Sequence, residues 1–211
     1  MPRRLPRSFY ERPTLTVLEE LIGKVLVHDA RGVRTAGAIV EAEAYIGEDD
    51  PACHAAPGPT RRNAPLYGAP GRAYVYLNYG IHYLVNAVTE AEGFPAAVLI
   101  RALAPIEGVP AMARRRGLPR AELKDPRTRA RLAQGPGNLT VAMGITIARN
   151  LADLVSGPLT IEDRGFVPDA LAWSPRIGIR VGTASPWRCH WANHPSVSGP
   201  RGAAVASRTT A

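Results

Sequence analysis

The sequence predicts a single domain of mixed α/β (α+β) class, built from antiparallel hairpins and short helices. Its 211 residues suit one compact domain with a hydrophobic core. Two stretches, 24–47 and 72–88, have the apolar and aromatic residues of paired strands on either side of a tight turn. Segments with apolar residues at helical intervals precede and follow these hairpins, and no repeat or linker divides the chain. We therefore expect one domain over 1–196 and a disordered tail over 197–211.

The first elements are expected to be a helix and a hairpin. Thr16 and Glu19 have the spacing of a capping box, so a helix is expected over 14–22, before Gly23. The two strands that follow meet at the turn Asp-Ala-Arg-Gly. After them comes a loop over 48–71 that is dense in Pro, Gly and Arg. Long ordered loops in compact domains are commonly functional, so this loop is a candidate part of a site.

The rest of the chain is expected to mix strands and helices. The second hairpin is followed by a short buried strand over 95–103 and by two arginine-rich helical segments over 106–117 and 120–134. A glycine-rich turn then leads into a short helix within GPGNLTVAMGI. The closing strands are expected near GPLTIED, at 157–163, and near IGIRVG, at 177–182.

The composition favours an anionic partner. The chain has 26 Lys and Arg against 18 Asp and Glu, and every basic residue except Lys24 and Lys124 is arginine. Arginine binds phosphate in bidentate geometry, and clustered basic residues gain affinity for DNA by releasing counterions. Nucleic acid is therefore the first candidate partner, although the coding composition of a genome explains an arginine bias equally well.

Cysteine usage and the N-terminus indicate a cytoplasmic protein, placed where the genome resides. Cys53 and Cys189 are too few and too far apart for a disulfide framework or a CxxC zinc site. No apolar run follows the basic N-terminus, so no signal peptide is expected. No stretch is long enough to span a bilayer, so no membrane partner is expected either.

The strand VEAEAYI, at 40–46, carries two carboxylates in an otherwise apolar run. Side chains of a strand alternate between its faces, so Glu41, Glu43 and Tyr45 share one side and the apolar residues share the other. The apolar side faces a core, and the polar side faces either water or a site. On the pattern alone, Glu41 and Glu43 are equal candidates for a catalytic carboxylate.

The second hairpin contains an irregularity in its aromatic pattern. Tyr74 and Tyr76 share one face, and the same phase would place Asn78 beside them. The segment LNYG is therefore a turn, with Asn78 and Gly80 in the permissive backbone positions and Tyr79 at the tip. An exposed tyrosine at a tip can insert between the bases of a bent duplex. Folding of Tyr79 back onto the sheet is an equally weighted alternative.

Several motifs together resemble one family. They are EAEAYIGEDDPACH, RNAPLYGAPGRAYVYLNYGIHYLVNAV, VLIRALAPIEG, GPGNLTVAMGI and SPWR. In their order and spacing, the chain resembles the alkyladenine (3-methyladenine) DNA glycosylase family over 9–191. The resemblance implies a single domain around a curved antiparallel sheet with a protruding β-hairpin and flanking helices. It also implies no metal and no organic cofactor.

The implied activity is that of a monofunctional DNA glycosylase of base excision repair, acting as a monomer on double-stranded DNA. Such an enzyme excises alkylated or deaminated purines, of the 3-methyladenine, 7-methylguanine, hypoxanthine and ethenoadenine class, and leaves an abasic site. Hydrolysis of an N-glycosidic bond needs a carboxylate that activates water and stabilises the developing cation. A base within a duplex must first be flipped into a pocket.

The resemblance implies a catalytic pair. It places the general base on Glu43, and it gives Arg101 a second contact that positions the water. Arg101 lies within the apolar run VLIRAL, so neutralisation of a buried carboxylate is an equally weighted role for it.

The resemblance implies a second set of residues that hold the DNA. Tyr45 and Tyr76 stack on the flipped base, His54 binds its edge, Asn86 guards its minor-groove side, and Tyr79 intercalates. From the residues alone, His54 is more often a structural loop histidine, and Tyr76 can be an ordinary sheet aromatic.

Two other classes of function compete with a glycosylase. A module that recognises distorted DNA without cutting it needs the basic surface and Tyr79, but no carboxylate in an aromatic pocket. A hydrolase of free nucleosides or small glycosides explains Glu43, but neither an exposed wedge nor the net charge of +8.

Overall fold

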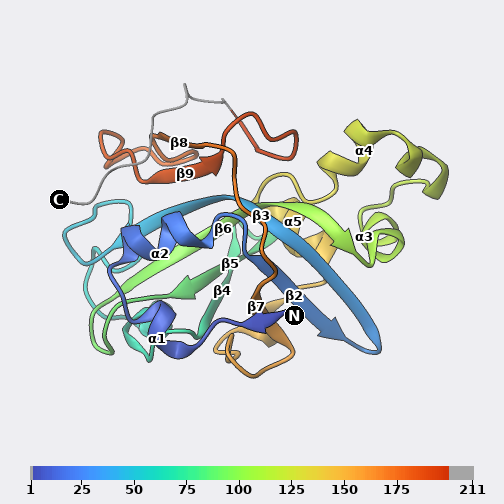
Figure 1. The fold of residues 1–211 in the computed structure, drawn as a ribbon. Helices are drawn as coiled ribbons and strands as arrows, with labels where there is room; N and C mark the ends of the chain where they lie inside the picture. The colour runs from blue at the N-terminus through green and yellow to red at the C-terminus, as the bar shows by residue number, and fades with distance from the viewer. Residues whose placement is uncertain (1, 200–211) are drawn as a thin grey trace.

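A nine-stranded sheet forms the frame of residues 2–199, which are the residues that the computed structural model describes. The main strand order is β1-β7-β2-β3-β6-β5-β4, while β9 pairs with β3 and β8 pairs with β9 (Figure 1). Every one of these pairings is antiparallel. The strands are β1 Arg3–Arg4, β2 Val25–Ala30, β3 Val33–Ile46, β4 Ala73–Asn78, β5 His82–Val88, β6 Ala96–Glu107, β7 Leu159–Asp163, β8 Leu171–Ser174 and β9 Arg188–Trp191. The predicted α+β class is confirmed.

Short helices flank the sheet. They are α1 Arg7–Tyr10, α2 Thr14–Leu21, α3 Val109–Arg115, α4 Pro126–Arg131 and α5 Pro136–Met143, with 3₁₀ turns η1 Ala64–Tyr67, η2 Arg120–Lys124 and η3 Ile147–Arg149. The predicted N-terminal helix is confirmed, and it ends one residue earlier than expected, at Leu21. Side chains of α2 and α5 share the main core with β3 and β6, so these two helices hold the central strands in place.

Strand β3 is the central element because it pairs with three others. It pairs with β2 over 33–38, with β6 over 36–46 and with β9 over 41–43. The pairing with β6 shifts register on both sides of Glu41. Such bulges bend a strand and increase its twist, which accounts for the curvature of β3 and β6 in Figure 1. Residues 35–44 of β3 are buried without interruption, so the carboxylate-bearing side of this strand faces the interior rather than water.

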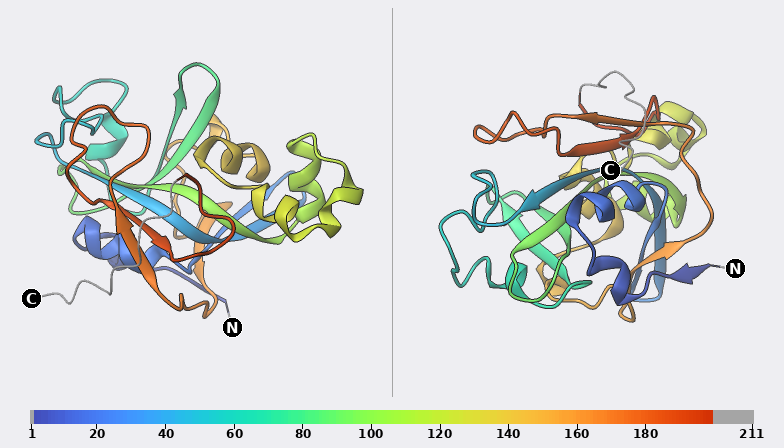
Figure 2. Two further views of the ribbon diagram at one scale, coloured as in Figure 1. Left: turned by 90° about the horizontal axis from the view of Figure 1, so that it is seen from above. Right: turned by 60° about the vertical axis from the view of Figure 1, so that its left-hand side comes forward.

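The second hairpin, β4–β5, stands clear of the sheet (Figure 2, left). Only its base, over 86–88 of β5, pairs with β6. Its outer part therefore projects from the domain, as the resemblance implied. The predicted first hairpin is also confirmed, with Arg31 and Gly32 at its turn.

The C-terminal region departs from the sequence prediction. Residues 177–182 form no strand but a series of bends, in which Gly178 has a φ of 81°. The backbone N–H of Ile177 donates to Glu43 instead of to a neighbouring strand. Strands β8 and β9 were not predicted, and β6 continues to Glu107, so the predicted helix at 106–117 begins only at Val109.

The end of the described chain packs against the domain. Val197 and Ser198 are buried, although the predicted tail begins at 197. The packed chain therefore extends beyond the predicted boundary, while the remainder of the predicted tail, 200–211, lies outside the described residues. Among the described helices, none has the length and apolar character needed to cross a membrane.

Candidate active site

The tip of the β4–β5 hairpin presents Tyr79 to solvent. Tyr79 and Gly80 both have positive φ, at 48° and 71°, and the N–H of Ile81 donates to the carbonyl of Asn78 at 3.0 Å. Positive φ at both central residues matches the twist of a hairpin, and Gly80 adopts it without a steric penalty. The side chain of Tyr79 is 85% exposed, so it does not fold back onto the sheet.

A cavity of about 380 Å³ lies along this hairpin, between β3, β4, β5, β6, the loop 48–71 and the segment 177–179. It is lined by six of the seven predicted site residues, Tyr45, His54, Tyr76, Tyr79, Asn86 and Arg101. These residues come from β3, the loop after it, both arms of the hairpin and β6. The fold thus brings together side chains that are far apart along the chain.

One wall of the cavity is aromatic. The ring centroids of His54 and Tyr76 lie 4.5 Å apart, and those of Tyr74 and Tyr76 lie 5.2 Å apart. Nδ1 of His54 lies 2.9 Å from the hydroxyl of Tyr74. Burial, together with the nearby Arg62, lowers the pKa of His54, so its ring is neutral at neutral pH. A neutral imidazole has one donor and one acceptor nitrogen, which suits recognition of a base edge.

Two buried side chains order the loop that carries His54. Nδ2 of Asn63 donates to the carbonyls of His54 and Gly58 at 2.8 and 2.9 Å. Asp50 accepts from the N–H groups of Ile46 and Ala52. The loop predicted to be functional is therefore held near its start by Asp50 and in its middle by Asn63.

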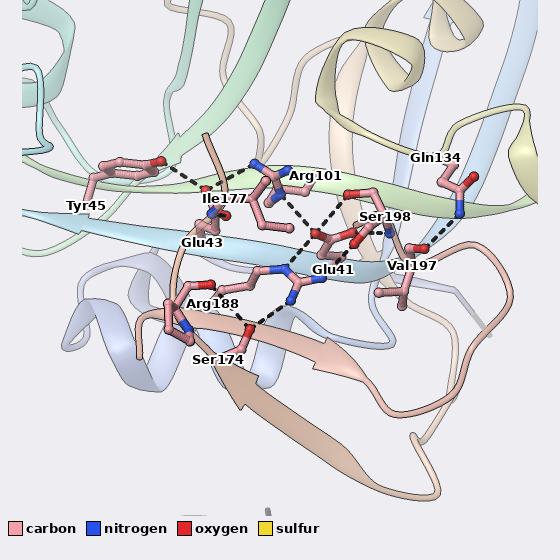
Figure 3. A network of polar contacts seen from close by, with 11 residues as sticks. Glu41, Glu43, Tyr45, Arg101, Gln134, Ser174, Ile177, Arg188, Val197 and Ser198 are labelled. Carbon is pink, nitrogen blue, oxygen red and sulfur yellow. Dashed lines mark hydrogen bonds and ion pairs between the residues drawn. The ribbon is translucent and has the colours of Figure 1, made fainter. Parts of the chain in front are cut away.

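Glu43 lies behind the cavity rather than on its surface. Its carboxylate is fully buried, and Oε2 accepts from the hydroxyl of Tyr45 at 2.9 Å and from Nη1 of Arg101 at 3.2 Å (Figure 3). Oε1 accepts from the N–H of Ile177 at 2.7 Å. All three partners line the cavity, so the carboxylate is one hydrogen bond away from it. Burial raises the pKa of Glu43, although Arg101, Ile177 and Tyr45 oppose the shift.

Glu41 has a different environment from Glu43. Its Oε1 accepts from Nε of Arg101 at 2.9 Å, and its Oε2 accepts from the N–H of Ser198 at 2.6 Å. Burial alone would raise the pKa of Glu41, but Arg101, Arg188 and Ser198 outweigh burial and hold that pKa below its ordinary value. Glu41 does not line the cavity. Glu43 does not line the cavity either, but it has three hydrogen-bond partners in the cavity wall where Glu41 has only Arg101, and of the two carboxylates it is the one whose pKa is raised.

Arg101 pairs with both buried carboxylates and also faces the cavity. It forms ion pairs with both Glu41 and Glu43, so it does neutralise buried carboxylates. It also lines the cavity. Burial alone would lower the pKa of Arg101, but Glu43 and Glu41 outweigh burial and raise it, so the guanidinium stays charged.

Asn86 is held at the cavity by its own hairpin. Nδ2 donates to the carbonyl of Tyr74, its cross-strand partner, at 2.9 Å. This hydrogen bond fixes the orientation of the amide within a nearly fully buried position. Asn86 therefore presents a rigid polar group to any molecule in the cavity.

Several residues that build the site were given no role from the sequence, although one of them, Arg188, lies in the motif SPWR. Arg176 packs its guanidinium over the ring of Tyr45, with Cζ 4.7 Å from the ring centroid, and it pairs with Asp50. Ile177, Arg188 and Ser198 contact the two carboxylates. These residues lie in the last quarter of the chain, and no local pattern marks them as partners of β3.

The described residues hold no group of three or more His, Cys, Asp or Glu side chains arranged to bind a metal ion. Cys53 lies in the cavity wall, and burial raises its pKa to about 11, so it is a thiol rather than a thiolate at neutral pH. Besides this thiol, the titratable and aromatic groups that line the cavity or lie behind it are the carboxylate of Glu43, the guanidinium of Arg101 and the rings of the aromatic wall.

Comparison with known proteins identifies the family. The family model for methylpurine-DNA glycosylase (MPG) matches residues 8–195. The chain belongs to the methylpurine-DNA glycosylase family. A relative from Methanocella arvoryzae is 50% identical over 198 residues, which cover 92% of this chain and 95% of the relative. A relative from Chlorobium phaeobacteroides (strain BS1) is 46% identical over 202 residues, which cover 94% of this chain and 96% of the relative. Both carry the provisional name 3-methyladenine DNA glycosylase.

Membership of the methylpurine-DNA glycosylase family makes the chain a DNA glycosylase, with DNA as its substrate. The resemblance found in the sequence motifs is thereby confirmed. The two competing classes, a DNA-binding module without activity and a hydrolase of free nucleosides, have no comparable support.

Proposed function

We propose that this protein is a monofunctional glycosylase that flips damaged purines out of double-stranded DNA and hydrolyses their N-glycosidic bond. The proposed substrates are 3-methyladenine, 7-methylguanine, hypoxanthine and ethenoadenine, and the product is an abasic site. The observation that carries the proposal is Glu43, a buried carboxylate of raised pKa joined by hydrogen bonds to the wall of an aromatic cavity. Every residue of the proposed site comes from one chain, which supports a monomeric enzyme.

The reaction begins with a water that attacks C1′ of the flipped nucleotide. Glu43 takes the proton of this water, and its negative charge stabilises the cation that develops on the sugar. A raised pKa makes Glu43 a better proton acceptor near neutral pH than an ordinary glutamate. Arg101 lies between Glu43 and the cavity, where it can orient the same water.

The flipped base is held by the aromatic wall. Tyr76 and Tyr45 stack on its faces, and His54 and Asn86 contact its edges. Tyr79 enters the duplex and fills the space that the base leaves, which recovers part of the stacking energy. Its exposure at the end of a projecting hairpin supports this role.

The product is expected to be an intact strand because neither of the two lysine side chains lies at the cavity. Glycosylases that also nick DNA form a Schiff base through an amine. Lys24 donates to Asp163 at 2.8 Å, and Lys124 is exposed in η2. Neither of these two lysines lines the cavity.

The test is to incubate the purified protein with a methylated duplex and to identify the released base and the remaining strand. We expect release of 3-methyladenine or 7-methylguanine, an intact abasic strand, and no adduct on borohydride treatment. An unmodified duplex and a free methylated nucleoside are the controls. Binding without release would favour the recognition module, and equal release from the free nucleoside would favour a nucleoside hydrolase.

A further inference from the structure

We propose that Glu41 is a positioning residue for base excision, which holds the guanidinium of Arg101 in the orientation that faces Glu43. This inference rests on the proposed function, because it concerns the same reaction. Glu41 does not line the cavity, and it acts through its hydrogen bond to Arg101 and through its charge, which raises the pKa of the nearby Glu43.

The geometry of Arg101 carries the first step. Its Nε donates to Glu41 at 2.9 Å, while its Nη1 donates to Glu43 at 3.2 Å. A guanidinium is planar, with its donors in a rigid fork. An anchor on Nε therefore fixes the plane of the group and the direction of Nη1. Figure 3 shows the arginine side chain between the two carboxylates.

Glu41 is itself held by the C-terminal part of the chain. Its Oε1 accepts from Nε of Arg188 at 2.8 Å and from the hydroxyl of Ser198 at 3.0 Å, and its Oε2 accepts from the N–H of Ser198. Arg188 also donates to Ser174 and to the carbonyl of Ser198, both at 2.7 Å. The Nε2 of Gln134 donates to the carbonyl of Val197 at 2.8 Å. Segments from three regions of the chain thus determine where the carboxylate of Glu41 lies.

Charges alternate along this network, from Arg188 to Glu41 to Arg101 to Glu43. Burial of a charge is costly unless the charge is paired and hydrogen-bonded, and Glu41 meets both conditions. Without the negative charge of Glu41, Arg101 would have Glu43 as its only carboxylate. The arginine would then pair more closely with Glu43 and turn away from its present orientation.

This rearrangement predicts a shift in pH dependence. The groups that face Glu43 are Arg101 on β6, Tyr45 and Glu41 on β3 and the N–H of Ile177, and Arg176 and Tyr76 also feel its charge. The charge of Glu41 raises the pKa of Glu43, whereas Arg101 lowers it. Replacement of Glu41 by glutamine therefore lowers the pKa of Glu43, and the acid limb of the rate profile should move to lower pH.

The experiment compares single-turnover base release from a methylated duplex by wild type, Glu41→Gln, Glu43→Gln and the double variant. We expect Glu41→Gln to lower the rate by about 10- to 100-fold, with the Kd for the duplex within about threefold of wild type. The rate of base release by the double variant should be no lower than that of Glu43→Gln alone, because Glu41 contributes to the same step as Glu43. Glu107→Gln is the matched control, since Glu107 also pairs with two arginines but lies outside the cavity.

A wild-type rate of base release in Glu41→Gln would overturn the proposal. The proposal would also fail if the rate loss of the double variant equalled the product of the two single losses and the acid limb of the Glu41→Gln rate profile stayed where it is in wild type. If Glu41→Gln does not fold, Ser198→Ala provides the test. This substitution removes the hydroxyl that donates to Glu41, but it keeps the charges of Glu41 and Arg101 and the hydrogen bond from the N–H of residue 198. We expect a rate loss of about threefold from Ser198→Ala, and an unchanged rate would overturn the proposal. Base release by the wild type in the same assay tests the proposed function separately.

Discussion

Arg176 donates to both carboxylate oxygens of Asp50, from Nη1 at 2.6 Å and from Nη2 at 2.8 Å, and both side chains are buried. The same guanidinium lies over the ring of Tyr45 and donates to the carbonyl of Ala44. The pair joins the loop after β3 to the segment that supplies the N–H of Ile177. The pair therefore helps to hold Tyr45, the presumed stacking ring, and the N–H of Ile177, which binds the presumed general base Glu43.

Arg176→Lys is expected to destabilise the protein by about 3 kcal/mol or more, because lysine cannot form the bidentate pair and leaves Asp50 partly unsatisfied. Urea unfolding measures this loss. Arg12→Lys is the matched control, because Arg12 makes a bidentate pair with Glu20 at the surface. Its loss should stay below about 1 kcal/mol. An equal decrease in the free energy of unfolding in the two variants would show that the buried pair stabilises the protein no more than the surface pair does.

Glu43→Gln is expected to lose about 10²–10⁴-fold in base release while DNA binding is kept, because an amide cannot accept the proton of the water. The variant should be at least as stable as wild type. The folded-state pKa of Glu43 is raised, so its ionised form costs folding free energy above that pKa, and glutamine removes this cost. Release assays and thermal unfolding on one preparation measure both effects. Near wild-type turnover would move the catalytic role away from Glu43.

The pH dependence of base release should show an acid limb set by Glu43. The general base must be ionised, and burial raises its pKa, so the rate should fall as the pH drops through a value above that of an ordinary glutamate. The pKa of His54 is lowered, so His54 stays neutral at neutral pH and above. Single-turnover rates across the acid range test this, with the uncatalysed depurination subtracted. A flat profile down to the ordinary range of glutamate would contradict it.

Tyr79→Ala is expected to weaken excision most when the lesion is in a stable base pair. An aromatic ring in the gap recovers part of an unstacking cost of a few kcal/mol, and a single strand has no comparable gap to fill. Rates on duplex and single-stranded substrates of one sequence measure the difference. Ile81→Ala is a matched control on the same exposed turn. Equal loss on both substrates would indicate a role in the pocket instead.

Asn86→Ser and Asn86→Ala are expected to raise excision of undamaged guanine, most visibly from mismatches. Guanine differs from hypoxanthine by its 2-amino group, and a fixed side chain against that edge can reject it by ~1–3 kcal/mol. The amide of Asn86 is fixed by its hydrogen bond to Tyr74, so it cannot turn aside easily. Release of guanine and of hypoxanthine is compared in one duplex context. An unchanged ratio of the two rates would show that Asn86 does not guard this edge.

The features that the sequence determined by itself are local ones. Strand alternation placed Glu41, Glu43 and Tyr45 on one face, and the structure confirms that this face is not in water. Turn chemistry placed Tyr79 at the tip of the second hairpin, although the residues of positive φ are Tyr79 and Gly80 rather than the predicted Asn78 and Gly80, because Asn78 still belongs to β4. Both features depend on neighbours within a few residues, so the pattern of residue types was sufficient to predict them.

The distinction between the two carboxylates was decided by the tertiary structure. On the pattern alone Glu41 and Glu43 were equivalent, but Ser198 and Arg188 bind one of them, and Ile177 binds the other. The incorrectly predicted strand at 177–182 has the same origin, because the N–H that a ladder would use is bound to Glu43. The pKa of a buried carboxylate depends on the groups that surround it in space, and these partners lie more than 130 residues along the chain from β3.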